Sequence, residues 1–230
     1  MCDEYTWKRG LWRHIRIKKY PLSFASLSIK LIALTFAEKL QLLSPFMLEL
    51  EQIQSLPADL RSWLIASFSI VQTEKDSLIL SEGEVCKYIW VVLKGVVRSF
   101  HYVGETEVTS RLMRPHHIII SVESFYTQTQ ASESLQALQP SVLACLHYQQ
   151  LETLYQQFPY FNFTGRKLTE HYLFLTERRL YLLRKQKAID KYKFFLEEYP
   201  GLINEIPLKY IASFLGINQE TLSRVRNKIR

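Results

Sequence analysis

The spacing of hydrophobic and polar positions changes several times along the chain of 230 residues. In residues 47–70, apolar positions recur every four residues and predict helical structure, with Ser55 as a candidate N-cap and Pro57 where a helix would begin. From residue 71, short runs rich in Val, Ile, Tyr and Phe alternate with turn signals such as Glu82–Gly83. Strands of this length, with turns about every ten residues, predict an antiparallel sandwich or roll.

A long helix is predicted over residues 161–187, because two apolar stripes run through that segment. The first stripe is Leu168, Tyr172, Leu175 and Leu182, and the second is Thr169, Leu173, Thr176, Leu180 and Leu183. A helix with two such stripes must bury both, one on its own domain and the other on a partner. We expect this to be a dimerisation helix that meets its copy in a second chain, and we assign the first stripe to it. The alternative is a helix buried inside one monomer.

The chain ends in the sequence "IASFLGINQETLSRVRNKIR", whose spacing is typical of a helix-turn-helix. The small side chain of Ala212 lets two helices cross closely, and Gly216 supplies a tight turn at positive φ. Leu222 then fills the space between the helices. The alternative interpretation is an ordinary helical hairpin on the surface.

The second of these helices would place polar side chains in the major groove of DNA. We expect four residues to read bases: Gln219, Glu220, Ser223 and Arg224. Arginine can donate two hydrogen bonds to guanine O6 and N7, and a glutamate can accept from cytosine N4. Phosphate contacts are expected from Asn218, which also caps the helix, and from Thr221, Arg226, Lys228 and Arg230.

Charge is distributed in a way that supports this interpretation. The formal net charge is +7, and residues 160–230 hold fourteen lysines and arginines against seven acidic residues. Residues 31–159 hold eight against thirteen. A basic C-terminal third is where a polyanion would bind, although a solvated basic face has the same composition.

Other function classes lack support in the sequence. The three cysteines lie far apart, which argues against a disulfide scaffold or a zinc site and favours a reducing cytoplasm. No acid/base pair, activated nucleophile or phosphate-binding loop emerges, so we expect no enzyme activity, no cofactor and no metal. The sequence contains no run of eighteen uncharged apolar residues, so it does not predict a membrane span. Residues 1–46 are basic and then apolar; we expect a leader of uncertain structure, dispensable for DNA binding, with the organised pattern beginning near Met47.

Two motifs resemble the Crp/Fnr family of bacterial transcription regulators. "ILSEGEVCKYIWVVLKG" is similar to the family's β-roll signature, and "GINQETLSRVRNKI" to its recognition helix. The resemblance implies an α+β fold: an antiparallel β-roll of the cyclic-nucleotide-binding type, a long dimerisation helix and a C-terminal helix-turn-helix. We therefore divide the chain into a leader (1–46), an effector domain (47–160), a dimerisation helix (161–187) and a DNA-binding domain (188–230).

The chain departs from the family pattern in two places. Members that bind cyclic AMP use a glutamate for the ribose and an arginine for the phosphate. The glutamate of this signature aligns with Ser121, which follows Ile120, and the arginine aligns with Ala131, which precedes Ser132. Without the arginine, a buried phosphate would lose its charge-assisted hydrogen bonds, and Glu123 and Glu133 would repel it. We also expect the chain to resemble the short branch of the family that lacks the C-terminal wing.

These observations predict a homodimeric, sequence-specific DNA-binding regulator that reads a palindromic site and is not gated by cyclic AMP. RNA polymerase is an expected partner, the effector is unknown, and no membrane contact is expected. The alternative is a sensory module that acts through protein contacts, with the C-terminal helices as a docking hairpin. An exposed basic surface on the last helix would favour the first interpretation, and an exposed apolar face the second.

Overall fold

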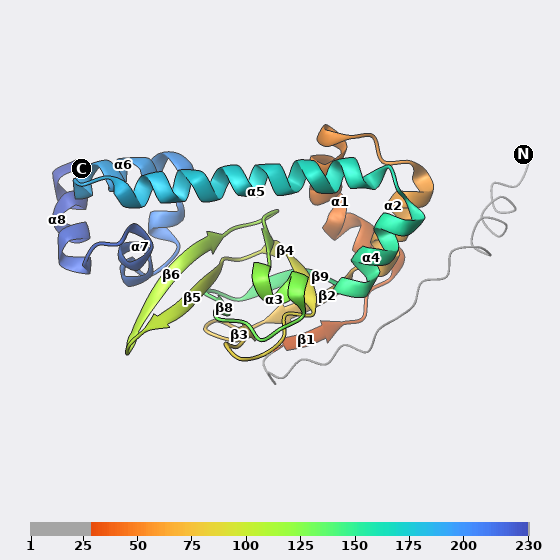
Figure 1. Cartoon of the computed structure of the whole chain (residues 1–230), viewed down its shortest axis with the longest axis horizontal. Coiled ribbons are helices and arrows are strands. Elements are labelled where there is room, and N and C mark those ends of the chain that lie inside the picture. The colour runs from red at the N-terminus through yellow and green to blue at the C-terminus, as the bar shows by residue number, and fades with distance from the viewer. Residues whose placement is uncertain (1–28, 230) are drawn as a thin grey trace, which may run out of the picture.

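The computed structural model describes residues 29–229 and contains an elongated arrangement of strands and helices (Figure 1). The helices are α1 (Phe36–Ile53), α2 (Ala58–Ser67), α3 (Val122–Thr127), α4 (Tyr148–Gln157), α5 (Phe161–Arg184), α6 (Ala188–Glu198), α7 (Leu208–Leu215) and α8 (Gln219–Ile229). Helix α5 lies across the strands, with α1, α2 and α4 at one end and α6, α7 and α8 at the other (Figure 1). None of the helices in this part of the chain is long and apolar enough to cross a membrane.

The strands form two antiparallel sheets. They are β1 (Ile29–Ile32), β2 (Ser69–Thr73), β3 (Leu78–Leu80), β4 (Tyr88–Lys94), β5 (Val97–Val103), β6 (Thr106–Met113), β7 (Ile118–Ile119), β8 (Ser134–Ala137) and β9 (Ser141–His147). The first sheet has the order β1-β2-β9-β4-β7, and the second has the order β3-β8-β5-β6. Neighbouring strands that are far apart in sequence, such as β2 and β9, close the roll, and the larger of two hydrophobic cores fills it.

Glycine fixes the turn between β4 and β5. Gly95 has φ +96°, and a Cβ atom on it would fall on the side chain of Ser141. Only glycine meets both constraints, because other residues pay for positive φ and for the added atom. This glycine turn is one of those expected between the short strands, and it carries the chain from β4 in the first sheet to β5 in the second.

The first structured residues lie upstream of the predicted start at Met47. Strand β1 pairs with β2 along its whole length, and α1 begins at Phe36. Thr35 and Glu38 form a capping box at the start of α1, which satisfies backbone donors at the helix end. Leu43 on the same helix is fully buried in the core. Residues 29–46 are thus part of the β-roll unit, and the prediction of a leader reaching residue 46 is wrong for them. Residues 1–28 lie outside the described part.

The helical segment predicted over residues 47–70 is two helices. Helix α1 ends at Ile53 and α2 begins at Ala58, so the expected cap at Ser55 does not form. Pro57 takes the N-cap position instead, with no side-chain hydrogen bond. Proline can occupy a helix start because the first backbone N–H groups have no partner within the helix.

Helix α5 turns its two apolar stripes toward different surroundings. Leu182 of the first stripe is fully buried, Leu168 packs on the core of the roll, and the Tyr172 hydroxyl accepts a hydrogen bond from the Ile118 amide at 2.6 Å. Leu175 is half-buried. The first stripe therefore faces its own chain, and its assignment to a dimer contact is wrong. The second stripe faces solvent, with Leu173 61%, Leu180 42% and Leu183 41% exposed.

Helices α6, α7 and α8 surround a second, smaller core. Phe195, Ile211, Leu215 and Leu222 are all fully buried in it. Val96, Leu112 and Leu138 from the roll belong to the same core. The α+β fold predicted from the sequence, with an antiparallel roll, a long helix and C-terminal helices, is confirmed.

Candidate functional site

The turn between α7 and α8 has the geometry that its sequence predicts. Gly216 has φ +61°, and its amide donates to the Ser213 carbonyl at 3.1 Å. The Ile217 amide donates to the Ala212 carbonyl at 3.1 Å, so two carbonyls at the end of α7 are satisfied. The side-chain oxygen of Asn218 accepts from the Thr221 amide at 2.8 Å and caps α8.

Two of the three residues that define the spacing, Ala212 and Leu222, lie in the small core, and Gly216 lies at the exposed turn beside it. Ala212 is buried against α8, and Leu222 is 0% exposed. A Cβ on Gly216 would also come within 3.4 Å of the Leu183 side chain from α5. From α6, the buried Lys191 ammonium donates to the Leu215 carbonyl at 3.0 Å, which places a positive charge at the C-terminus of α7. The α7–α8 pair is therefore held at a fixed angle by groups from two other helices.

The predicted base-reading residues lie together on the outer face of α8. Gln219, Glu220 and Arg224 are exposed, and Ser223 is half-buried. The Arg224 guanidinium donates to the Thr221 hydroxyl of its own helix at 3.3 Å. A long hydrogen bond at the surface is easily exchanged for a stronger one, so the guanidinium is available to a ligand.

The residues expected to contact phosphates have different surroundings. The side chain of Asn218 is used as the cap of α8, and the Thr221 hydroxyl accepts from Arg224. Arg226 donates to the side-chain oxygen of Asn204 at 3.3 Å, which ties α8 to the turn before α7. Lys228 is exposed, and Arg230 lies outside the described residues. Lys228 is thus the clearest remaining cation on this helix for a phosphate.

The positions aligned with the cyclic-nucleotide signature do not form an anion site. Ser121 precedes α3 and is buried, and Glu123 and Ser132 are exposed. Ala131 is buried; its amide donates to the Glu84 carbonyl, and its carbonyl accepts from Gly83, both at 2.8 Å. Because Glu123 lies outside on α3, the expectation that it repels a phosphate in the pocket is wrong.

An ion pair that the sequence did not indicate lies between β6 and the segment before β8. The Arg111 guanidinium donates to Glu133 at 2.6 Å and to the Ile120 carbonyl at 2.8 Å. The Ser99 hydroxyl donates to the other oxygen of the same carboxylate. Glu133 is therefore a paired charge and not the free repulsive one predicted. No local motif could reveal a pair of residues 22 positions apart in sequence.

A cavity of about 380 Å³ lies between α1, α5 and the turn that joins β6 to β7. His116 in this turn has φ +73°, a conformation uncommon outside glycine, and its Nδ1 lies 2.7 Å from a Glu49 carboxylate oxygen. Burial, with a contribution from Arg114, lowers the pKa of His117 to about 4. Within residues 29–229, no three His, Cys, Asp or Glu side chains are arranged to hold a metal ion.

Comparisons with known proteins place this geometry in context. Residues 70–158 match the family described as the cyclic nucleotide-binding domain. No curated protein sequence matches the chain.

Several solved structures have the same fold. FixK2 from Bradyrhizobium japonicum is 20% identical, with a TM-score of 0.62 over 70% of this chain and 84% of that one. The c-di-GMP responsive regulator CLP from Xanthomonas campestris is 15% identical, with a TM-score of 0.58 over 75% and 91%. A CooA mutant from Carboxydothermus hydrogenoformans is 18% identical, with a TM-score of 0.57 over 79% and 82%. Residues 70–158 are thus similar to the cyclic nucleotide-binding domain, and the fold of the chain is that of these solved structures, as its resemblance to the Crp/Fnr regulators implied.

Proposed function

We propose that the protein is a homodimeric, sequence-specific DNA-binding transcription regulator, in which α7 and α8 form a helix-turn-helix. The observation that carries this proposal is the outer face of α8, where Gln219, Glu220 and Arg224 are exposed on a rigidly held helix. Arg224 has the chemistry to contact guanine O6 and N7, and Glu220 to accept from cytosine N4. Lys228, on the next turn, would contact a phosphate and carry no sequence information.

The character of this surface favours DNA over a protein partner. Protein docking through a helix depends on an apolar face. On α8, Leu222 is buried and Val225 half-buried, so Ile229 is the one exposed apolar side chain, at 38%. The remaining exposed residues are charged or amide side chains, which suit base edges and phosphates.

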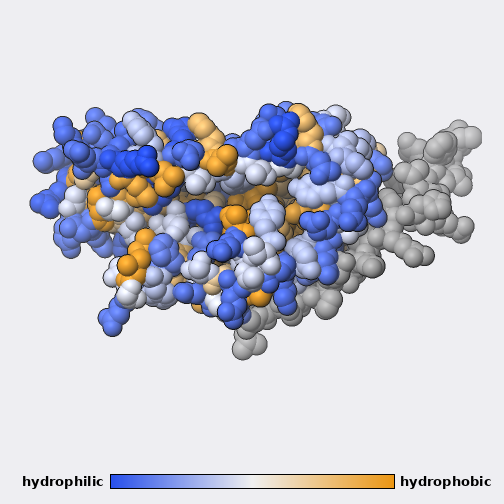
Figure 2. All heavy atoms as spheres, in the orientation of Figure 1, coloured by the Kyte–Doolittle hydropathy of each residue, from blue (hydrophilic) through white to orange (hydrophobic). Residues whose placement is uncertain are grey.

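The second stripe of α5 supports the dimer. Leu173, Leu180 and Leu183 are exposed, and Thr169 and Thr176 complete a spacing of four and three residues between them. This spacing is that of a coiled-coil seam. Apolar side chains also reach the surface along α5 between hydrophilic ones (Figure 2). A second copy of α5 would cover the seam and place two copies of α8 about a two-fold axis.

A regulator of this kind would act where DNA and RNA polymerase are present, and it would contact the polymerase next to its site. We infer that cyclic AMP is not the signal, since Ser121 and Ala131 offer no charged group to a ribose phosphate. Both inferences follow from the proposed role and are tested separately from DNA recognition.

The test is selection of binding sites from random duplexes by the purified protein without added nucleotide. The proposal predicts a palindromic sequence whose half-sites are one helical turn apart, roughly 34 Å. The matched control is the variant Gln219→Ala/Glu220→Ala/Arg224→Ala, which changes the outer face of α8 and none of its buried residues. Enrichment of no sequence, or of the same sequence by protein and variant, would contradict base reading by α8.

A further inference from the structure

Strands β5 and β6 carry two polar networks on opposite faces. Neighbouring residues on a strand point to opposite sides, so Arg98 and Ser99 face apart. On β6, Ser99 pairs with Arg111 and Phe100 pairs with Thr109, so Ser110 is the extra residue of a bulge. This bulge turns the side chains of Thr109 and Arg111 to opposite faces of the sheet. Arg111 therefore lies on the Ser99 face, and Thr109 on the face of Arg98.

The inner network consists of Ser99, Arg111 and Glu133. The Glu133 carboxylate accepts from Arg111 on one oxygen and from Ser99 on the other. Its side chain is 17% exposed, and Ser99 is fully buried. The Arg111 side chain is 29% exposed, so its charge is only partly solvated and an anion beside it is favourable. In this chain the anion is a side chain of the protein itself.

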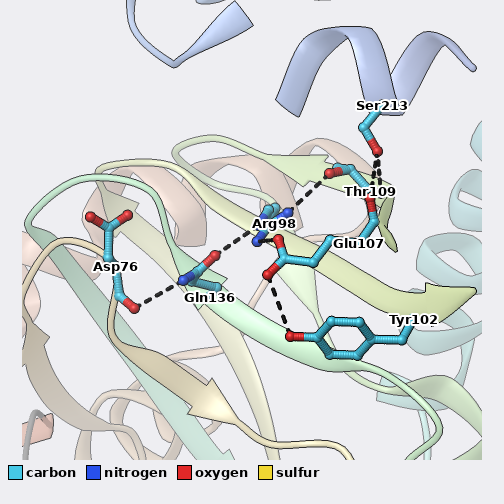
Figure 3. Close-up of polar contacts among 7 residues, drawn as sticks. All are labelled: Asp76, Arg98, Tyr102, Glu107, Thr109, Gln136 and Ser213. Atoms are coloured by element: carbon cyan, nitrogen blue, oxygen red, sulfur yellow. Dashed lines mark hydrogen bonds and ion pairs between the residues drawn. The ribbon is translucent and has the colours of Figure 1, made fainter. Parts of the chain in front are cut away.

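The outer network surrounds Arg98, whose side chain is 1% exposed (Figure 3). Its guanidinium donates to Gln136 at 2.8 Å and to the Thr109 hydroxyl at 3.3 Å, and it pairs with Glu107. The same group lies 4.0 Å from the ring centre of Tyr210 on α7. Arg98 therefore joins β5, β6 and β8 to the first helix of the helix-turn-helix.

Further contacts hold α7 against β6. The Thr109 amide donates to the Ser213 hydroxyl at 2.9 Å, and that hydroxyl donates to the Glu107 carbonyl at 3.2 Å (Figure 3). From α5, the Arg179 guanidinium lies 3.8 Å from the ring centre of Phe214 and also donates to the Ser110 carbonyl at 3.3 Å. The position of α7 thus depends directly on the local shape of β6 around residues 107–110.

We propose that Glu133 is a resident anion of the β-roll: its carboxylate occupies Arg111 and Ser99 in place of a soluble anionic effector and so holds β5 and β6 in the form that seats α7. The two networks share a strand pair: on β5 they use the adjacent residues Arg98 and Ser99, and on β6 they lie on either side of the bulge at Ser110. A shift of Arg111 therefore moves the bulge, and with it the Thr109 amide that binds Ser213. The inference rests on the proposed function only in taking the seat of α7 to be what positions α8.

The test compares Glu133→Gln with the unchanged protein by amide hydrogen exchange, which reports local opening without DNA. Glutamine keeps the shape of the side chain and removes its charge. We expect the amides of residues 208–215 to exchange about tenfold faster in the variant, since its hydrogen bonds to a charged group are replaced by weaker ones to a neutral group. Glu123→Gln is the matched control, an exposed glutamate on α3 whose charge is removed in the same way, and it should leave the rate unchanged.

Rescue with inorganic phosphate separates a resident anion from a merely structural residue. Phosphate, at ionic strength matched with chloride, should restore slow exchange in Glu133→Gln, because binding to the native form stabilises it. It should not do so in Arg111→Gln/Glu133→Gln, and it should leave the unchanged protein as it was. If Glu133→Gln does not fold in chloride, folding in phosphate is the expected result.

The proposal is overturned if residues 208–215 exchange at the same rate in Glu133→Gln as in the unchanged protein. It is equally overturned if phosphate has the same effect on the double variant, or protects the unchanged protein as it protects Glu133→Gln. None of these readouts involves DNA. A failure of sequence-specific binding would therefore leave this result standing, and a failure here would leave the DNA proposal standing.

Discussion

Helix α8 and the Arg111–Glu133 pair of the β-roll satisfy their polar groups in opposite ways. On α8, Glu220 and Arg224 are exposed, and water can satisfy them until a ligand arrives. In the roll, Arg111 and Glu133 are mostly enclosed and satisfy each other. The difference follows from solvation: a surface group can remain unpaired at little cost, whereas a buried charge needs a partner in every molecule. The outer face of α8 is thus open to a ligand, whereas Arg111 and Glu133 of the roll already occupy each other.

The largest effect is expected where α7 and α8 depend on the core between them. Leu222→Ala should destabilise the helical unit by about 2–5 kcal/mol, the range for a large aliphatic side chain removed from a packed core. Denaturant unfolding followed by circular dichroism measures this loss. Asn227→Ala, an exposed substitution on the same helix, is the control and should change stability little. Equal stability of the two variants would mean that α8 is not packed as described.

The second prediction is that the exposed second stripe of α5 holds the dimer together. Leu180→Glu places a charge in the exposed seam, and it should weaken the dimer on the order of a hundredfold because two carboxylates would meet in an apolar contact. Sedimentation over a range of concentrations measures the change. Thr176→Glu should act in the same direction, whereas Glu177→Gln, on an exposed position of the same helix, should not. A dimer unchanged by Leu180→Glu would remove α5 as the interface.

Acid should destabilise the roll through His117. Its pKa is lowered from 6.5 to about 4 in the folded state, so between these values the unfolded chain binds a proton that the folded chain does not. The contribution of His117 to the unfolding free energy is therefore fully present above pH 6.5 and is lost as the pH drops toward 4. The loss should be less than about 3 kcal/mol, since the side chain is only half-buried. The unfolding free energy should depend less steeply on pH in His117→Gln than in the unchanged protein over this range. An unchanged slope would mean that His117 is not the responsible group.

No effect at all is predicted for cyclic AMP. Ser121 and Ala131 carry no charge, and the nearby guanidinium of Arg111 is occupied by Glu133. Calorimetry should show no binding at micromolar concentrations, and DNA affinity should be the same with and without the nucleotide. Micromolar binding would show that the Arg111–Glu133 pair opens to a ligand and that its contrast with the exposed face of α8 is wrong.

The spacing of apolar residues and the positions of glycines predicted those parts of the fold that depend on residues close together in sequence. The turn at Gly216 follows from its positive φ, and the buried positions of α7 and α8 follow from helical spacing. The strands and turns of the roll were predicted for the same reason, since alternation and glycine signals are local. The exposed face of α8 was also predictable, because helical spacing places the polar residues on the side opposite the buried ones.

Long-range pairing was not predictable in the same way. Arg111 and Glu133 are each unremarkable in their local sequence, and only the closure of the roll brings them together. The start of the domain was misplaced because β1 is four residues long and gains its stability from pairing with β2. The first stripe on α5 packs on its own chain and not on a partner as expected, because spacing shows that a helix has two apolar faces and does not show which one meets its own chain.

The most direct test of the account is the specificity of DNA binding by three proteins: the unchanged chain, Arg224→Ala and Lys228→Ala. Each is titrated with the selected site and with a scrambled duplex at several salt concentrations. Arg224→Ala should lose about 1–3 kcal/mol on the selected site and relax preference at one base pair. Lys228→Ala should weaken both duplexes alike and reduce the salt slope by about one contact. If the two variants behave identically, with sequence preference intact in both, α8 does not read bases and the central claim is contradicted.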